Sequence, residues 1–174
     1  YICEVKINIG DIVEGLYSLN EVLLPGEEKI VRSSYYISDI TVGDKQVTLE
    51  FRDGADKVIS SYSAIMGAQL AISEVYLTWN YIELFGYYYL KDITCKVTNK
   101  GNLPAWIDKA KLAIDGKEES GGVYEKVLPG QTRMVEPSVY ISEIRPGSKT
   151  LALELEDSAG EVMCSYSATV IPSE

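Results

Sequence analysis

Residues 22–64 read VLLPGEEKIVRSSYYISDITVGDKQVTLEFRDGADKVISSYSA, and residues 126–168 read KVLPGQTRMVEPSVYISEIRPGSKTLALELEDSAGEVMCSYSA. The two segments align without a gap at a constant offset, and 20 of their 43 positions are identical. Shared strings such as Leu-Pro-Gly, Tyr-Ile-Ser and Ser-Tyr-Ser-Ala do not arise together by chance. The chain therefore contains an internal duplication.

The second copy, residues 68–174, is predicted to be a complete antiparallel β-sandwich. Its apolar and polar residues alternate over short stretches, which end at turn signals such as Asp115-Gly116 and Pro146-Gly147. This spacing is typical of a seven-stranded sandwich, and no stretch predicts a helix. Strands are expected at Leu70–Trp79, Leu90–Thr98, Ile107–Ile114, Tyr124–Leu128, Arg133–Ile144, Thr150–Leu155 and Val162–Val170. The stretch Arg133–Ile144 is either one strand broken near Pro137 or two strands.

The first copy, residues 1–67, is predicted to be incomplete at its N-terminus. Val5–Ile9 resembles Ala110–Ile114 after a one-residue shift, but nothing in the first copy corresponds to Leu70–Asn102. We expect an all-β chain of two repeated immunoglobulin-like sandwich units, the first lacking its opening strands. One composite jelly-roll-like sandwich is the alternative.

Several turn motifs resemble those of a known class of domain. They are the strand and turn from Val97 to Asn102, the Asp115-Gly116 turn, the Leu128-Pro129-Gly130 turn and the leucine-striped strand that follows. In this pattern the chain resembles cell-adhesion-related (CARDB-type) and fibronectin-III-like sandwiches, over all of Leu70–Pro172 and part of Tyr1–Met66. The resemblance implies tandem modules of prokaryotic surface proteins, and it bears on architecture more than on function.

The composition argues against several classes of function. The chain has no histidine, which removes imidazole bases and most transition-metal sites, so we expect a protein that is not an enzyme. A net charge of -10 argues against nucleic-acid partners, and no apolar run is long enough to span a membrane. Because the first residue is Tyr1 and a strand pattern begins at once, we expect a processed, extracellular or cell-surface protein.

Three cysteines, Cys3, Cys95 and Cys164, are too scattered for a disulfide framework or a zinc site. Each falls on the apolar phase of its predicted strand, so we expect buried free thiols. The only pairing to consider is Cys95 with Cys164. Two tyrosine pairs that recur in the duplication, Tyr62 with Tyr166 and Tyr36 with Tyr140, are expected to be core or corner residues.

Aromatic residues concentrate in one predicted hairpin between Trp79 and Leu90. Rigid rings of this kind cover a core, anchor a protein interface or stack on sugars, and all three roles remain open here. The residues concerned are Trp79, Tyr81, Phe85, Tyr87, Tyr88 and Tyr89.

Acidic residues recur in two equivalent hairpins, at Asp53 and Asp56 and at Glu156 and Asp157. They are expected to be solvated turn residues, with calcium bridging as the alternative because hard cations prefer convergent carboxylates. No other cofactor is expected.

The segment Tyr1–Gly10 alternates cleanly, with Cys3, Val5, Ile7 and Ile9 on its apolar side. It is a candidate donor strand, because an incomplete sandwich exposes an apolar groove and unpaired edges. Three things would fill such a groove: residues outside this sequence, the Leu70–Thr98 hairpin serving both copies, or a strand from a neighbouring subunit.

These observations favour a structural or adhesive subunit. We expect it to form a homo-oligomer or polymer, such as a filament or surface layer, through strand exchange and aromatic contacts. The alternative is a carbohydrate-binding module of a secreted protein, with Trp79 and the neighbouring tyrosines forming an exposed row.

Overall fold

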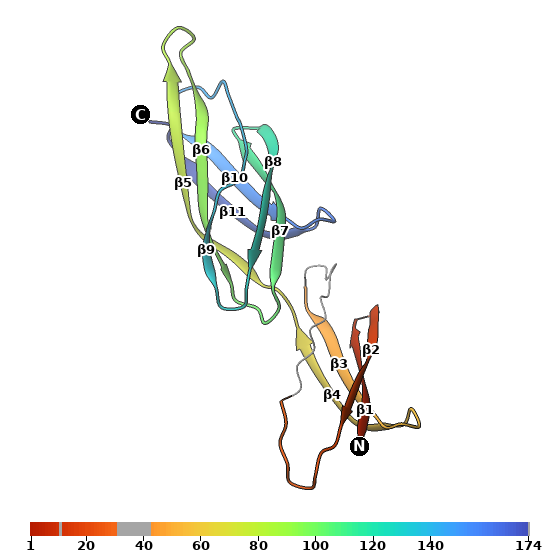
Figure 1. Ribbon diagram of the computed structural model, residues 1–174. Coiled ribbons are helices and arrows are strands. Elements are labelled where there is room, and N and C mark those ends of the chain that lie inside the picture. Colours follow the sequence, from red (N-terminus) through yellow and green to blue (C-terminus); the bar gives the residue numbers. More distant parts are fainter. Residues whose placement is uncertain (11, 31–42, 174) are drawn as a thin grey trace. The chain divides into compact units, whose positions relative to one another are not determined.

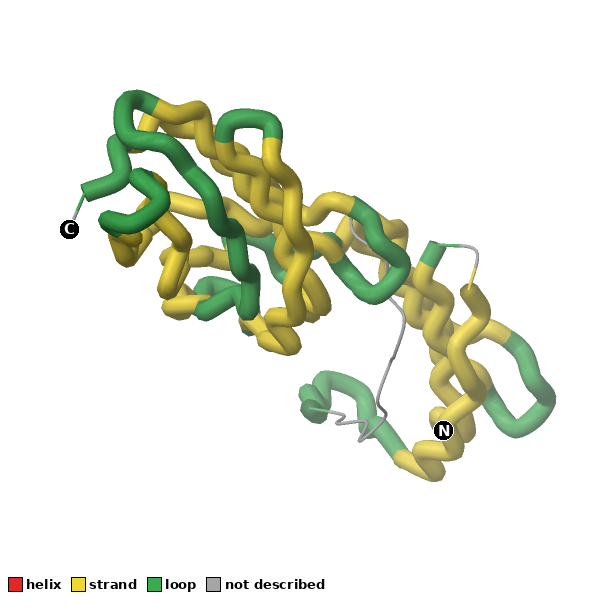
Figure 2. Tube along the Cα trace, turned by 90° about the horizontal axis from the view of Figure 1, so that it is seen from above, coloured by secondary structure: helices red, strands yellow, loops and turns green. Residues whose placement is uncertain are grey.

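The computed structural model describes residues 1–10, 12–30 and 43–173, with the backbone alone for the strand Ile12–Glu21 (Figure 1). Every regular element in these residues is a β-strand, and Figure 2 shows only strands and loops. The strands form three antiparallel sheets, so the predicted all-β fold is confirmed. Across the described ranges there is no helix with the length and hydropathy needed to cross a bilayer.

The chain divides into two compact units, the first ending at Met66 and the second beginning at Gly67. The second unit is a sandwich of two sheets. One sheet has the order β11-β10-β7-β8 and the other has the order β5-β6-β9. Their strands are β5 (Leu70–Ile82), β6 (Tyr87–Asn99), β7 (Ala105–Ile114), β8 (Lys117–Val127), β9 (Thr132–Val135), β10 (Lys149–Glu156) and β11 (Val162–Val170).

The core of the second unit lies between these two sheets. Alternate residues of each strand point to the same face, so the leucine stripe of β10 and the apolar positions of β6 and β7 are buried together. Each fully buried leucine or isoleucine contributes about 1.5–3 kcal/mol of hydrophobic stabilisation. The central side chains, all fully buried, are Leu90, Val97, Ile107, Leu112, Ile114, Leu151, Leu153 and Leu155.

A buried asparagine closes one end of this sandwich. The Asn99 amide donates to the carbonyls of Leu103 and Val127, and its oxygen accepts from the backbone N–H of Gly101. These partners satisfy the buried amide and tie the turn between β6 and β7 to the end of β8. Gly101 must be glycine, because a Cβ there would lie 2.2 Å from the carbonyl oxygen of Gly67.

The first unit is a single sheet of four strands in the order β2-β1-β3-β4. These strands are β1 (Ile2–Ile9), β2 (Ile12–Glu21), β3 (Lys45–Arg52) and β4 (Val58–Met66). Within the described residues of this unit there is no second sheet.

The sheet of the first unit repeats the β11-β10-β7-β8 sheet of the second. β3 pairs with β4 in the register Leu49↔Tyr62, and β10 pairs with β11 in the register Leu153↔Tyr166, which is the offset of the duplication. Both pairs have a bulge at the same place, between Phe51 and Arg52 in one and between Leu155 and Glu156 in the other.

The inner strands match as well. β1 pairs with β3 through Val5↔Phe51, and β7 pairs with β10 through Ala110↔Leu155. This pairing reproduces the one-residue shift seen in the sequence.

Three strand predictions in the second unit need correction. β8 begins at Lys117, well before the predicted Tyr124, since Gly121 and Gly122 continue the strand beside β7. β5 extends beyond Trp79 to Ile82 and makes one long hairpin with β6. Within the predicted strand Arg133–Ile144 only the start belongs to a strand, β9, and Ile144 forms an isolated bridge with Tyr88.

Candidate functional site: the apolar face of the first sheet

The predicted donor strand is an inner strand of its own sheet. β1 is hydrogen-bonded along one edge to β2 and along the other edge to β3. Because both edges are paired from Glu4 to Ile9, this stretch is not available to add to a neighbour's sheet, and the prediction of a donor strand is corrected on this point. The outer strands of the sheet are β2 and β4.

The register of the sheet defines one apolar face. Val5, Ile7 and Ile9 of β1 lie opposite Phe51, Leu49 and Val47 of β3, and paired residues of neighbouring strands share a face. β4 adds Tyr62 and Ala64 to the same face. We call this surface the unit 1 apolar face; it consists of Val5, Ile7, Ile9, Val47, Leu49, Phe51, Tyr62 and Ala64.

The opposite face of the sheet is polar. Ser61 and Ser63 of β4 alternate with the apolar residues, and the Ser63 hydroxyl accepts a hydrogen bond from the Gln46 amide at 3.0 Å. Arg52 pairs with Glu50 at 2.7 Å and with Asp56 at 2.6 Å, and these two acids raise the pKa of its guanidinium. The sheet therefore has the two-sided character of a sandwich layer.

The central part of the same face is covered in the second unit. The counterparts of Ile7, Leu49 and Phe51 are Leu112, Leu153 and Leu155, and those three leucines have no solvent exposure. Their cover is the β5-β6-β9 sheet.

The unit 1 apolar face is only partly shielded. Val5, Ile9 and Val47 are buried, but Ile7, Leu49 and Phe51 are half-buried. Among the described residues the first unit offers no strands equivalent to β5 and β6 to cover them. The segment that corresponds to β9 begins at residue 28, and its residues 28–30 lie outside any strand.

The exposed fractions of Tyr62 and Tyr166, which occupy the same position in the duplication, show this difference in cover. Tyr166 is half-buried and packs against the core, whereas Tyr62 is 61% exposed. Repeated tyrosines are predicted to be core or corner residues, and a core position is wrong for Tyr62. It is also wrong for Tyr140, which is 63% exposed, and Tyr36 lies outside the described residues. Burial at a repeated position depends on the sheet that covers it. The duplication repeats the β11-β10-β7-β8 sheet but not the strands β5 and β6 that cover it.

The remaining N-terminal candidate, Cys3, lies beside the β3–β4 hairpin. A Cβ added to Gly54 would be 3.3 Å from its Sγ atom. All three cysteines are free thiols, but only Cys95 is buried as predicted, whereas Cys3 and Cys164 are half-buried. Burial raises the pKa of Cys95 to about 11, and burial together with the neighbouring Cys95 raises the pKa of Cys164 to about 12.

The aromatic residues of the β5–β6 hairpin form three separate groups. Tyr88 contacts Trp79 and Tyr81, with ring centroids 6.5 Å and 4.8 Å apart, on the side that faces the core. Phe85 stacks on Tyr87 at 5.6 Å with an interplanar angle of 11°. The third group consists of Tyr89, on β6, and Tyr140.

Tyr89 contacts Tyr140, at a centroid distance of 6.0 Å, and accepts a hydrogen bond from the Asn80 amide. Trp79 is only 7% exposed. The predicted exposed row headed by Trp79 is therefore not present, because the largest ring is part of the core.

The most exposed apolar residues of this hairpin lie at its turn. The backbone N–H groups of Phe85 and Gly86 donate to the Ile82 carbonyl, and Gly86 has a φ of +66° that suits glycine. Leu84 is 84% exposed and Phe85 is 61% exposed. We call residues Ile82–Tyr87 the hairpin tip. Leu84 was not predicted, although an isolated leucine in a turn is a signal that the sequence offers.

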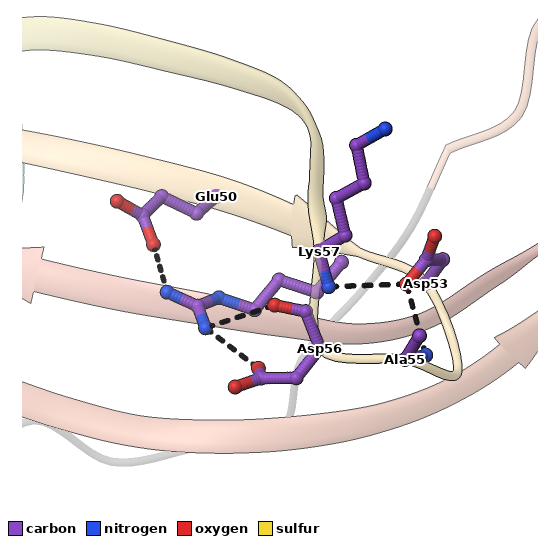
Figure 3. Close-up of polar contacts among 6 residues, drawn as sticks. Glu50, Asp53, Ala55, Asp56 and Lys57 are labelled. Atoms are coloured by element: carbon purple, nitrogen blue, oxygen red, sulfur yellow. Dashed lines mark hydrogen bonds and ion pairs between the residues drawn. The ribbon is translucent and has the colours of Figure 1, made fainter.

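The acidic hairpins use their carboxylates within the turn. The Asp53 carboxylate accepts hydrogen bonds from the backbone N–H groups of Lys57 and Ala55 at 3.0 and 2.9 Å (Figure 3), and these bonds lower its pKa. Asp157 accepts equivalent bonds from Glu161 and Ala159, each at 2.9 Å.

The other two predicted calcium ligands have different settings. Asp56 is paired with Arg52, and Glu156 is the last residue of β10. Across the described residues no group of three or more acidic, cysteine or histidine side chains is placed to hold a metal ion. The carboxylates of Asp53 and Asp157 thus stabilise two identical turns.

No family model, curated protein or solved structure matches this chain. The resemblance to adhesion-related and fibronectin-III-like domains therefore remains a prediction from turn motifs.

Proposed function

We propose that this protein is a non-enzymatic, extracellular structural or adhesive subunit that associates with other copies of itself through the unit 1 apolar face. The supporting observation is the contrast between two equivalent sheets. The sheet in the second unit is covered by β5, β6 and β9, and the sheet in the first unit has no such cover among the described residues.

The physical reason is the hydrophobic effect. Soluble proteins rarely leave a contiguous apolar face of a sheet in water, and such a surface marks a site of association. Stacked sheets pack with their apolar faces about 10 Å apart, so a second layer of β-structure is the natural partner. Strand addition at the outer strands β2 and β4 is a further route to the exchange contacts expected from the sequence.

The experiment compares two variants of adjacent residues on β4. Tyr62→Lys places a charge on the unit 1 apolar face, whereas Ser61→Lys places the same charge on the polar face. We expect the wild-type chain and Ser61→Lys to associate as concentration rises and Tyr62→Lys to remain monomeric. Sedimentation velocity measures the mass, and negative-stain microscopy shows whether filaments form.

A wild-type chain that is folded and monomeric up to about 1 mM contradicts the proposal, because even a contact of about 4 kcal/mol is populated at that concentration. Equal association of the two variants also contradicts it, since the contact would then not involve this face.

No separate observation favours carbohydrate binding. A glycan platform needs flat rings open to solvent, and Trp79, the largest ring of the aromatic hairpin, is buried. The Tyr88 ring faces the core beside it. Self-association is therefore the one function proposed for this protein.

A further inference from the structure

We infer that the partner of the unit 1 apolar face is the hairpin tip of a second copy, so that the chains join head to tail. This inference rests on the proposed function and adds the identity of the opposing surface. Among the described residues no second sheet covers the unit 1 apolar face, whereas a β-hairpin covers the equivalent sheet of the second unit.

The second unit shows which element covers a sheet of this kind. The β5–β6 hairpin lies across the β11-β10-β7-β8 sheet and buries Leu90, Cys95 and Val97 completely. The unit 1 apolar face repeats the strand order and register of that sheet. Its shape and alternation therefore suit an amphipathic β-hairpin of the β5–β6 type.

The core-facing part of this hairpin is already used within its own unit. Trp79 and Leu90 mark its last pair of buried residues, and beyond them the chain continues through the hairpin tip. In Figure 1 the turn between β5 and β6 lies at one end of the second unit. The tip therefore remains available for a contact outside its own sandwich.

The tip carries apolar area in a preformed arrangement. Leu84 and Phe85 are the exposed side chains, and the stacking of Phe85 on Tyr87 holds the phenyl ring in place. A rigid ring loses little conformational entropy on binding, which is why such residues serve as anchors. An exposed anchor and a partly exposed apolar face on one chain are complementary surfaces.

Charge is consistent with an apolar contact. Between Tyr81 and Leu90 the only charged residue is Glu83, in a chain whose net charge is -10. The tip therefore brings little of the repulsion that two acidic chains exert on each other.

The two surfaces differ, so the contact is heterologous. Each chain has one tip and one unit 1 apolar face, and a head-to-tail contact of this kind adds chains in series. A face-to-face contact would instead stop at a symmetric dimer.

Two variants test the inference when they are mixed. Leu84→Ser with Phe85→Ser removes the tip anchors, and Tyr62→Lys blocks the face. Each variant alone should associate at least about tenfold more weakly than wild type, which corresponds to about 1.4 kcal/mol. A mixture of the two should form 1:1 complexes that grow no further, because one chain supplies an intact face and the other an intact tip.

The control is Ile171→Ser, which removes a 68% exposed apolar residue that belongs to neither surface and should leave assembly unchanged. Thermal melts should show that all variants keep the wild-type fold, since the substituted side chains are mostly exposed.

The outcomes separate the inference from the proposed function. If the tip variant associates as wild type does and Tyr62→Lys does not, self-association stands and the head-to-tail inference is overturned. A mixture that stays monomeric also overturns the inference. A wild-type chain that never associates overturns both.

Discussion

At the scale of single residues, the second unit has a buried thiol, Cys95, and a half-buried thiol, Cys164, on different sheets. Cys95 belongs to β6 and Cys164 belongs to β11. Burial is the main reason that the pKa values of both rise, since a thiolate is poorly stabilised away from water. The reactive form of each is therefore scarce at neutral pH.

We expect Cys95 and Cys164 to resist alkylation in the folded protein. With pKa values of about 11 and about 12, at most about a thousandth of either thiol is ionised at pH 8, compared with about a quarter of an ordinary cysteine. Their rates should rise about tenfold per pH unit between pH 7 and 9. Mass spectrometry after iodoacetamide treatment measures this.

The control for alkylation is the same reaction in denaturant, where all three cysteines should react at ordinary rates. Rapid labelling of Cys95 in the native state would contradict the burial that the sandwich imposes.

At the scale of elements, β3 and β10 are matched strands in different settings. Leu49 and Leu153 occupy the same position in the duplication, but only Leu153 is fully buried. The contrast isolates the effect of the covering sheet, because the strand order and register are the same.

We expect Leu153→Ala to lower the free energy of unfolding of the second unit by about 2–5 kcal/mol, as is typical of a buried leucine. Leu49→Ala should leave that unit unchanged and weaken self-association instead. Both tryptophans, Trp79 and Trp106, lie in the second unit, so tryptophan fluorescence during urea unfolding reports on that unit alone. Equal shifts of this transition for both variants would contradict the assignment.

Much of the sheet architecture was predictable from the duplication. Once Leu49–Glu50 is aligned with Leu153–Glu154, the pairing of β3 with β4 follows from that of β10 with β11. The alignment of Val5–Ile9 with Ala110–Ile114 likewise predicted which strands are equivalent.

Other features depend on tertiary contacts, which local sequence patterns do not predict. The alternation in Tyr1–Gly10 shows an amphipathic strand but does not show that both of its edges are paired. The polar, glycine-containing sequence from Lys117 to Tyr124 looks like a turn, yet it pairs with β7 as part of β8. Tyr62 is exposed because the described residues of the first unit supply no second layer over it, and its own sequence context is nearly that of Tyr166.

At the scale of the whole molecule, the net charge of -10 sets the balance between association and repulsion. Each contact between copies brings two acidic chains together, while the proposed contact surfaces are apolar. Repulsion is screened over about 10 Å at 0.1 M salt, and the apolar contact is not weakened by that screening.

We therefore expect self-association to strengthen as sodium chloride rises from about 0.02 M to about 0.5 M, a range over which the screening length falls several-fold. Sedimentation velocity at constant protein concentration measures the change. Assemblies that dissociate as salt rises would contradict an apolar contact, because that behaviour is typical of ion pairs between opposite charges.

The duplicated hairpins also bear on how the chain folds. β4 and β11 share the sequence Ser-Tyr-Ser-Ala in the same register, so each of β3 and β10 meets two competing partners during folding. Only the correct partner is joined by a tight turn, at Asp53–Lys57 or Asp157–Glu161, and closing a short loop loses far less chain entropy than closing a long one. We therefore expect the two aspartate turns to favour the correct strand pairing over cross-pairing, a characteristic hazard of tandem repeats.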